Sequence, residues 1–174
     1  DLHLCDRRQR QMCIRDRIYV VLPLALLGVW GYKSDYQLFM NTEYLLMALF
    51  VFVWTNDTGA YIVGCTLGKH RLFERISPKK SWEGFFGGLA FCIILASLAN
   101  YIIPGMLSTA QWIGMGILTS IFSTWGDLCE SLLKRTAGVK DSGKILPGHG
   151  GILDRFDSEL IASPVIFIYL TFVL

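Results

Sequence analysis

The longest polar stretch of the chain, residues 126–158, carries charged side chains of both signs. Its acidic residues are Asp127, Glu130, Asp141, Asp154 and Asp157. Its basic residues are Lys134, Arg135, Lys140, Lys144 and Arg155. Solubility of a loop does not require such a balance. Acids that bind a divalent metal, interleaved with bases, are suited to holding an anionic substrate.

Asp127 is the most informative of these acids. It follows 43 consecutive residues without a charge, from Gly84 to Gly126. A carboxylate inside an apolar helix is costly unless it is paired or used. Glu130 lies at i+3 on the same helix face, and Lys134 lies two turns on. The alternative is a Glu130–Lys134 surface pair, with Asp127 merely at the membrane interface.

Asp154 and Asp157 flank Arg155 at the entry to the last apolar segment. If that segment is already helical there, both carboxylates face the same way. Carboxylates from two segments that converge on Mg²⁺ are typical of phosphate chemistry. Simple capping explains the spacing equally well, because acids are favoured at helix N-termini.

Residues 147–151, PGHGG, form a predicted tight turn. Glycines at 148, 150 and 151 allow positive φ and a close approach of backbone N–H groups to a ligand. A turn without a ligand accounts for the same pattern. His149 contacts a phosphate or a base in the first interpretation, and is a surface residue in the second.

Two further sites interrupt the apolar pattern. Lys79 and Lys80 lie in the segment 77–84 that we expect to open a helix, where they oppose the helix dipole unless an anion is bound. The positive-inside rule is the alternative explanation.

Asn56 and Asp57 lie within the apolar segment 44–68. Either Asp57 lines the same polar cavity as Asp127, or the helix breaks there.

The composition indicates an integral membrane protein. Of the 174 residues, 53% are hydrophobic and only 17% are charged, whereas soluble domains carry about 25% charged residues. These values exclude a disordered chain and a nucleic-acid-binding protein, and the net charge of +2 suggests no polyanionic partner. The apolar segments begin and end near residues 18–32, 44–68, 84–103, 111–135 and 158–174. We therefore predict an all-α polytopic fold with about five transmembrane helices and a polar funnel between them.

The basic residues predict the orientation. Of the eleven lysines and arginines after residue 17, ten lie in the loops that follow the second and fourth apolar segments. By the positive-inside rule this face is cytoplasmic. Both polar loops, and hence the active site, are expected there.

The ends and the cysteines add three expectations. Residues 1–17 contain QMCIRDR, which resembles a translated sequencing adapter, so we predict a non-native segment. A basic juxtamembrane segment is the alternative. The remaining domain, residues 18–174, is expected to be truncated at both ends. The five cysteines have no CxxC spacing, so we predict neither a disulfide nor a zinc site.

Three motifs together resemble the signature of the phosphatidate cytidylyltransferase (CDP-diacylglycerol synthase) family. They are SLLKR at 131–135, KDSG at 140–143 and LPGHGGILDRFD at 146–157. NDTGAY at 56–61 and GKH at 68–70 also resemble this family, as does SPKKSWEG at 77–84. The family more often has Thr at position 81, and Ser81 keeps the hydroxyl group. The resemblance covers the chain from about residue 45 to its end.

The resemblance implies that CTP and phosphatidic acid react to give CDP-diacylglycerol and pyrophosphate, with Mg²⁺ and a possible second cation. It implies that Asp127 and Asp154 hold the metal. The implied catalytic residues are Asp127, Lys134, Asp141, Asp154 and Asp157. The expected substrate-binding residues are Asn56, Asp57, Ser77, Lys79, Lys80, Ser81, Arg135, Lys140, His149, Gly150, Gly151 and Arg155.

The implied partners are CTP, phosphatidic acid and the lipid bilayer, without nucleic acid and with a homodimer as one option. We expect a bacterial inner membrane. Two alternatives are a CTP-dependent lipid-alcohol kinase, which transfers the γ-phosphate, and a transporter that uses Asp57 and Asp127 as a cation path. The full signature argues against the kinase. A transporter needs neither the PGHGG turn nor the KD motif.

Overall fold

The fold is mostly helical, as the sequence predicts. The computed structural model describes residues 42–73, 76–136 and 153–173, with a few residues between 21 and 28. Residues 1–20 and 137–152 lie outside the described residues, so the prediction for residues 1–17 stays a prediction. The elements in chain order are α3 (Thr42–Leu67), β1 (Arg71–Phe73), β2 (Ser77–Ser81), α4 (Trp82–Ile102), α5 (Thr109–Thr136) and α6 (Leu153–Val173).

Helix α3 runs without a break through the polar sequence at residues 56–59. The alternative that the helix breaks at this point is therefore wrong. The hydroxyl groups of Thr55 and Thr66 donate to backbone oxygens one turn back, at 2.7 and 2.9 Å. Such bonds satisfy polar side chains within an apolar helix, and they leave Asn56 and Asp57 for contacts with other elements.

Residues 77–81 form a strand instead of the start of a helix, which corrects the prediction for this segment. β2 pairs antiparallel with β1, and Arg71 lies opposite Ser81. Ser81 has an extended backbone (φ −121°, ψ 156°), and its hydroxyl oxygen accepts a hydrogen bond from the Gly84 N–H at 3.1 Å. A serine in this role begins a helix at the next residue. Lys79 and Lys80 thus precede α4, and the helix-dipole argument for them fails.

The remaining helix boundaries lie close to the predicted ones. α4 ends just before the Pro104-Gly105 pair, where Gly105 has φ +84°. α5 extends slightly beyond the predicted range at both ends, whereas α6 begins at Leu153, before the predicted start at 158. Positions 154 and 157 are therefore both helical.

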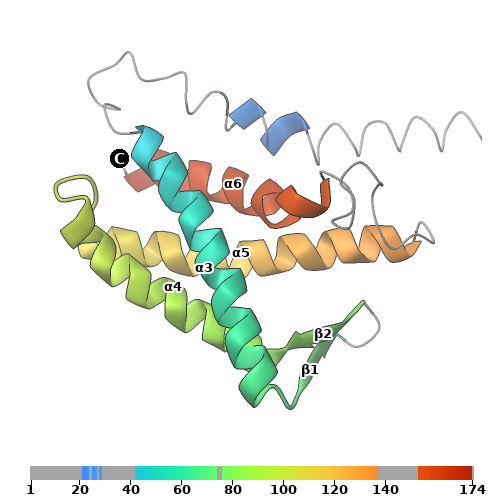
Figure 1. The fold of residues 1–174 in the computed structure, drawn as a ribbon. Helices are drawn as coiled ribbons and strands as arrows, with labels where there is room; N and C mark the ends of the chain where they lie inside the picture. Colours follow the sequence, from blue (N-terminus) through green and yellow to red (C-terminus); the bar gives the residue numbers. More distant parts are fainter. Residues whose placement is uncertain are drawn as a thin grey trace, which may run out of the picture.

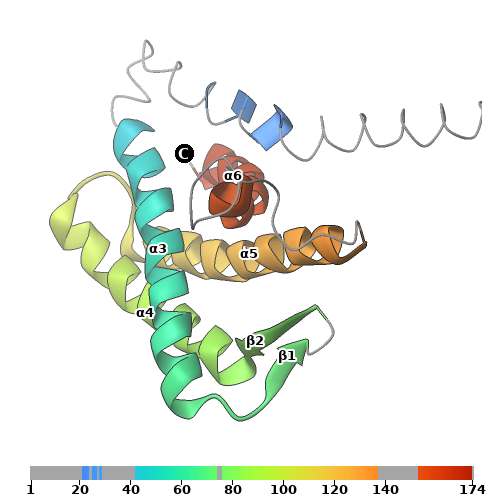
Figure 2. The same ribbon diagram turned by 45° about the vertical axis from the view of Figure 1, so that its right-hand side comes forward.

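The helices form a layered arrangement in which α3 crosses α5. Figures 1 and 2 show α3 beside α4, and α6 packed against α5, with the axes of α5 and α6 crossing in Figure 2. The hairpin projects from the end of α3 and α4, on the side of the C-terminal half of α5. Glycines allow the close contact of α3 with α4. A Cβ on Gly88 would lie 2.6 Å from Asn56 Oδ1, and one on Gly87 would lie 2.5 Å from the Val63 side chain. Small residues are typical of helix interfaces in membranes.

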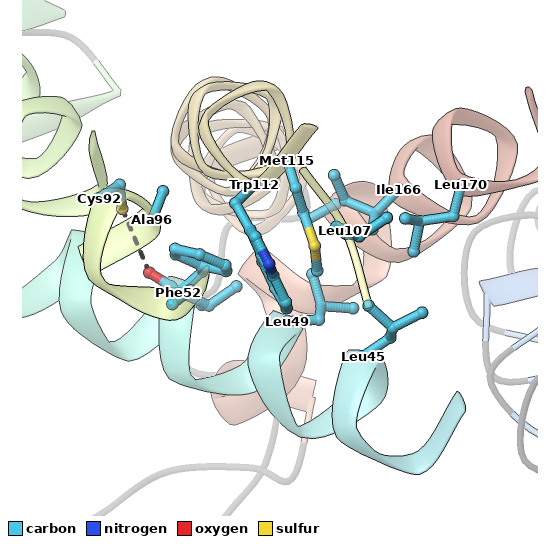
Figure 3. Packing of buried hydrophobic residues seen from close by; sticks show 13 residues of the cluster. Leu45, Leu49, Phe52, Cys92, Ala96, Leu107, Trp112, Met115, Ile166 and Leu170 are labelled. Carbon is cyan, nitrogen blue, oxygen red and sulfur yellow. Dashed lines mark hydrogen bonds between the residues drawn. The ribbon is translucent and has the colours of Figure 1, made fainter. Parts of the chain in front are cut away.

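The apolar core occupies the half of the molecule away from the hairpin. Figure 3 shows Phe52 and Leu49 of α3 packing near Trp112 and Met115 of α5. The Cys92 thiol donates to the Phe52 carbonyl oxygen at 3.4 Å, so this cysteine is a buried packing residue. The polar side chains Asn56, Asp57, Lys80 and Asp127 lie on the side of the hairpin.

Three described helical stretches are long and apolar enough to cross a membrane: Tyr44–Leu67, Trp82–Ile102 and Phe156–Val173. The prediction of a membrane protein is confirmed at this level. α5 is not among these three stretches: its first 18 residues carry no charge, but their glutamine, glycine, serine and threonine residues lower the mean hydropathy. The predicted first span, residues 18–32, lies mostly outside the described residues, so the number five stays a prediction.

Candidate active site

A polar cavity of about 250 Å³ lies where α3, α4, α5 and the hairpin meet. Its polar side chains come from α3, β2 and α5, and α4 contributes Gly84 and Phe85. The lining side chains that carry hydrogen-bonding or charged groups are Asn56, Asp57, Tyr61, Lys80, Ser81, Thr124 and Asp127. The prediction that Asp57 lines the same cavity as Asp127 is confirmed.

An ion pair joins the hairpin to α5 in this cavity. Lys80 Nζ lies 2.5 Å from Asp127 Oδ2, and it also donates to the Thr124 carbonyl oxygen at 3.5 Å. Ser131, one turn on, donates its hydroxyl to Asp127 Oδ1 at 3.3 Å. Both side chains of the pair remain partly exposed, at 25% and 34%. An ammonium and a carboxylate that face one accessible cavity present both signs of charge to a ligand.

Asn56 also lines this cavity, and its hydrogen bonds join α3 to α5. Its side-chain amide donates to Ser123 Oγ at 3.1 Å and to Thr124 Oγ1 at 3.4 Å, and its Oδ1 accepts from Ser120 at 2.6 Å. Only 2% of Asn56 is exposed. A fully bonded buried amide is a strong positional restraint. Asn56 therefore fixes the position of Asp57 on α3 relative to Asp127 on α5. The substrate-binding role predicted for Asn56 stays a prediction.

A second group of acids lies deeper, between α5 and α6. Glu130 is 1% exposed, and Lys134 Nζ lies 3.2 Å from its Oε2. The Glu130–Lys134 pair that the alternative predicts is therefore present, but Glu130 is buried instead of lying at the surface. Asp157 interacts electrostatically with Glu130, Asp57 and Asp127. The close approach requires Gly126, since a Cβ there would lie 2.7 Å from the Asp157 carbonyl oxygen.

The structure brings together five of the predicted site residues in the cavity: Asn56, Asp57, Lys80, Ser81 and Asp127. Asp157 and Lys134 do not line the cavity: Asp157 interacts electrostatically with Asp57 and Asp127, and Lys134 pairs with Glu130. Ser77 begins β2 opposite Phe73, and Arg135 is exposed at the end of α5, so both lie apart from the cavity. The other predicted residues fall on undescribed side chains or segments: Lys79, Lys140, Asp141, His149, Gly150, Gly151, Asp154 and Arg155.

Sequence reasoning missed the hydroxyl residues of α5. Ser120, Ser123 and Thr124 hold Asn56, and all three are buried. Their i, i+3 and i+4 spacing in an apolar helix was the available signal, because a polar stripe of that period predicts a polar partner across the interface. Glu159, buried on α6 near Asp57 and Asp157, was also missed.

The donor chemistry of this site fits a hard divalent cation. Within the described part of the chain, no group of three or more histidine, cysteine, aspartate or glutamate side chains is arranged to hold a metal ion. Mg²⁺ does not need such a group, because it is usually bound by one or two carboxylates, waters and substrate phosphates. Asp127 has a partly exposed carboxylate of the kind that such a site would use.

Comparison with protein families identifies the chain. The model of the cytidylyltransferase family matches residues 4–173. The chain belongs to the cytidylyltransferase family. This cytidylyltransferase domain is 42% identical over 156 residues to a Staphylococcus aureus (strain COL) protein named phosphatidate cytidylyltransferase. Proteins of the same name from Staphylococcus haemolyticus and Staphylococcus epidermidis are 42% and 41% identical over 155 residues.

Each of these alignments covers 89% of this chain and 59% of the relative. The chain therefore spans a little more than half the length of the relatives it matches. The family resemblance found in the sequence motifs is confirmed. The ion pair of Lys80 and Asp127 lies within the matched region of the cytidylyltransferase family.

Proposed function

We propose that the protein transfers a cytidylyl group from CTP to phosphatidic acid. An oxygen of the lipid phosphate forms a bond to the α-phosphorus of CTP, while the bond from that phosphorus to the bridging oxygen breaks. Pyrophosphate leaves with the electron pair, and CDP-diacylglycerol is the product. The observation that carries the proposal is the Lys80–Asp127 pair in a cavity at the junction of a family-matched helical bundle.

The described side chains support this proposal. Both reactants are anions, so their repulsion must be offset, and positioning supplies much of the remaining acceleration. Lys80 binds a phosphate oxygen and holds it over Asp127. Lys134 lies one layer deeper, where it neutralises Glu130. No nucleophilic serine, cysteine or histidine is needed, because the lipid phosphate is itself the nucleophile.

Mg²⁺ would be held by Asp127 and Asp154. When bound, it would neutralise charge on the phosphates of both reactants. Asp127 is supported for this role by its partial exposure and by the Ser131 hydroxyl, which fixes its other oxygen. Position 154 is one turn before Asp157 on α6, which packs against α5 at Gly126.

The membrane setting suits a lipid substrate. The spans place an apolar bundle beside a polar cavity, so acyl chains remain in a lipid-like environment while CTP arrives from water. The distribution of basic residues supports an orientation with this cavity toward the cytoplasm. The three candidate spans support a multi-pass protein, and the bacterial relatives support a bacterial cell membrane.

The test is an assay in detergent micelles with phosphatidic acid and CTP labelled at either the α- or the γ-phosphate. We expect the α label to enter the lipid phase, to stop on addition of a chelator and to resume with Mg²⁺. Asp127→Asn should abolish transfer. The control is Glu83→Gln, the same acid-to-amide change at a residue of α4 that pairs with His70. Its rate of transfer should stay near that of the wild type.

Two outcomes would contradict the proposal. Entry of the γ label into a lipid alcohol would make the protein a kinase. Normal Mg²⁺-dependent transfer by both Asp127→Asn and Asp154→Asn would remove the two carboxylates from the mechanism.

A further inference from the structure

An apolar groove of about 390 Å³ lies beneath the hairpin, against the C-terminal half of α5. Leu72, Phe73 and Ile76 form the side made by the hairpin and its turn. Among the residues that line it, Thr124 carries the single hydroxyl group. The other lining residues come from α4 and α5 and are Trp82, Phe85, Trp125, Leu128, Cys129 and Leu132.

This groove adjoins the polar cavity. Leu72, Phe85 and Thr124 line both. Lys80 contacts the Thr124 carbonyl oxygen from the polar side, while the Thr124 residue borders the apolar side. A hydrocarbon compartment beside an ammonium–carboxylate pair matches one class of ligand, an amphiphile with an anionic phosphate head.

The order of environments along α5 supports this match. Thr124 and Asp127 line the polar cavity. Five α5 residues line the groove: Thr124, Trp125, Leu128, Cys129 and Leu132. At 1.5 Å per residue this groove extends for about 12 Å. Beyond it, Arg71 and Arg135 border a third cavity that shares Leu72 and Leu132 with the groove. Cations therefore lie on both sides of an apolar lining, which complements an anionic lipid.

The exposure of the groove residues fits a lipid environment. Trp82 and Trp125 are 47% and 56% exposed, and Phe73 and Leu132 are similarly open. Tryptophan is enriched at the level of lipid headgroups. The groove begins at Trp82, the first residue of a candidate span, so it lies where a chain can enter it from the bilayer.

We propose that this groove binds one acyl chain of the lipid substrate while its phosphate lies at Lys80, and that the groove residues thereby set the acyl-chain preference. The inference rests on the proposed cytidylyltransferase function. It assigns the hairpin a role in lipid selection, since Leu72 and Ile76 form the wall opposite α5.

The first test does not depend on turnover. Phosphatidic acid with a photoreactive diazirine on one acyl chain is irradiated with the full chain in micelles, and the labelled peptides are identified by mass spectrometry. We expect label in residues 72–85 and 124–132. Cys129→Trp fills the groove from an exposed position and should remove most of that label. Ile94→Trp, at an exposed position of α4 outside the groove, should not.

The second test measures kcat/KM with long-chain and with very short-chain phosphatidic acid. Cys129→Trp should lower the long-chain value roughly tenfold and leave the short-chain value nearly unchanged, as expected when a hydrophobic subsite is filled. Leu132→Trp is a second variant with the same expectation, which guards against misfolding of the first.

The outcomes separate the groove from the reaction. Label in the groove without cytidylyl transfer would support the lipid site and contradict the proposed function. Cytidylyl transfer with no label in the groove, or with label confined to distant lipid-facing positions, would overturn the lipid site alone. Crosslinks between two copies of the chain at the groove would show a protein contact there and would also overturn it. The lipid site would also be overturned if Cys129→Trp and Leu132→Trp each lowered kcat/KM equally for long-chain and short-chain phosphatidic acid.

Discussion

Lys80 of the hairpin and Asp127 of α5 meet at 2.5 Å across the polar cavity. The contact joins two polar segments that lie on either side of the 43 uncharged residues between Gly84 and Gly126. Between these two residues the chain forms α4 and most of α5, which pack against each other. Because Lys80 precedes these helices and Asp127 lies near their end, the packing of α4 against α5 determines whether the two side chains meet.

Lys80→Met should reduce kcat/KM about 100-fold, the loss typical when one preorganised electrostatic donor is removed. Lys80→Arg should recover part of the activity, because it restores charge without the compact ammonium geometry. The measurement is steady-state transfer of α label from CTP. Lys69→Met removes an exposed lysine at the end of α3 and serves as the control. If the Lys80→Met and Lys69→Met variants have equal activity, Lys80 contributes only to membrane orientation, as the positive-inside rule describes.

Asn56→Leu should lower the free energy of unfolding by about 1–3 kcal/mol, since it leaves the Ser120 and Ser123 hydroxyls buried without their amide partner. Thermal or SDS-induced unfolding in detergent measures this loss. Asn100→Leu makes the same change at an exposed hydrogen bond to Thr109, where the expected effect is below about 0.5 kcal/mol. Similar losses in the two variants would contradict the positional role of Asn56.

Gly88→Ala should destabilise the bundle by about 1–3 kcal/mol, because the added Cβ would lie 2.6 Å from Asn56 Oδ1 and force α3 away from α4. The shift should also move Asp57 from Asp127 and lower transfer activity. Ala90→Val adds bulk on the exposed face of the same helix and is the matched control. Unfolding midpoints of the two variants that coincide would contradict this packing account.

Ser81→Ala should cost about 0.5–2 kcal/mol through loss of the cap on α4, whereas Ser81→Thr should retain the cap. The comparison also separates two roles of this hydroxyl. If Ser81 serves only as the cap, kcat/KM should fall in proportion to the folded fraction. If kcat/KM of Ser81→Ala falls much further than the folded fraction, the Ser81 hydroxyl contacts the substrate directly.

Much of the fold could be predicted from the sequence because membrane helices depend on local composition. The segment 84–103 and the break at Pro104-Gly105 follow from apolar length and from backbone chemistry, and α4 ends as expected. The family signature at 131–157 likewise predicted the chemistry before any geometry was known. Its assignment to the cytidylyltransferase family is confirmed by the match over residues 4–173.

The hairpin could not be predicted from local pattern. Residues 77–81 become a strand because they find a partner in Arg71–Phe73, and Ser81 then begins α4. A strand of this length depends on its neighbour, so composition alone cannot distinguish it from the first turn of a helix. The consequence is functional, because only the strand directs Lys80 toward Asp127.

The sequence by itself determined which residues carry charge in an apolar chain, and hence which residues are candidates for chemistry: Asp57, Asp127 and the acids of the signature. The tertiary structure alone decided which of them meet. Asp57 and Asp127 share a cavity because Asn56 bonds to the α5 hydroxyls and because glycines let α3 and α4 approach closely. Contacts between segments this far apart depend on packing across the bundle, which no local pattern encodes.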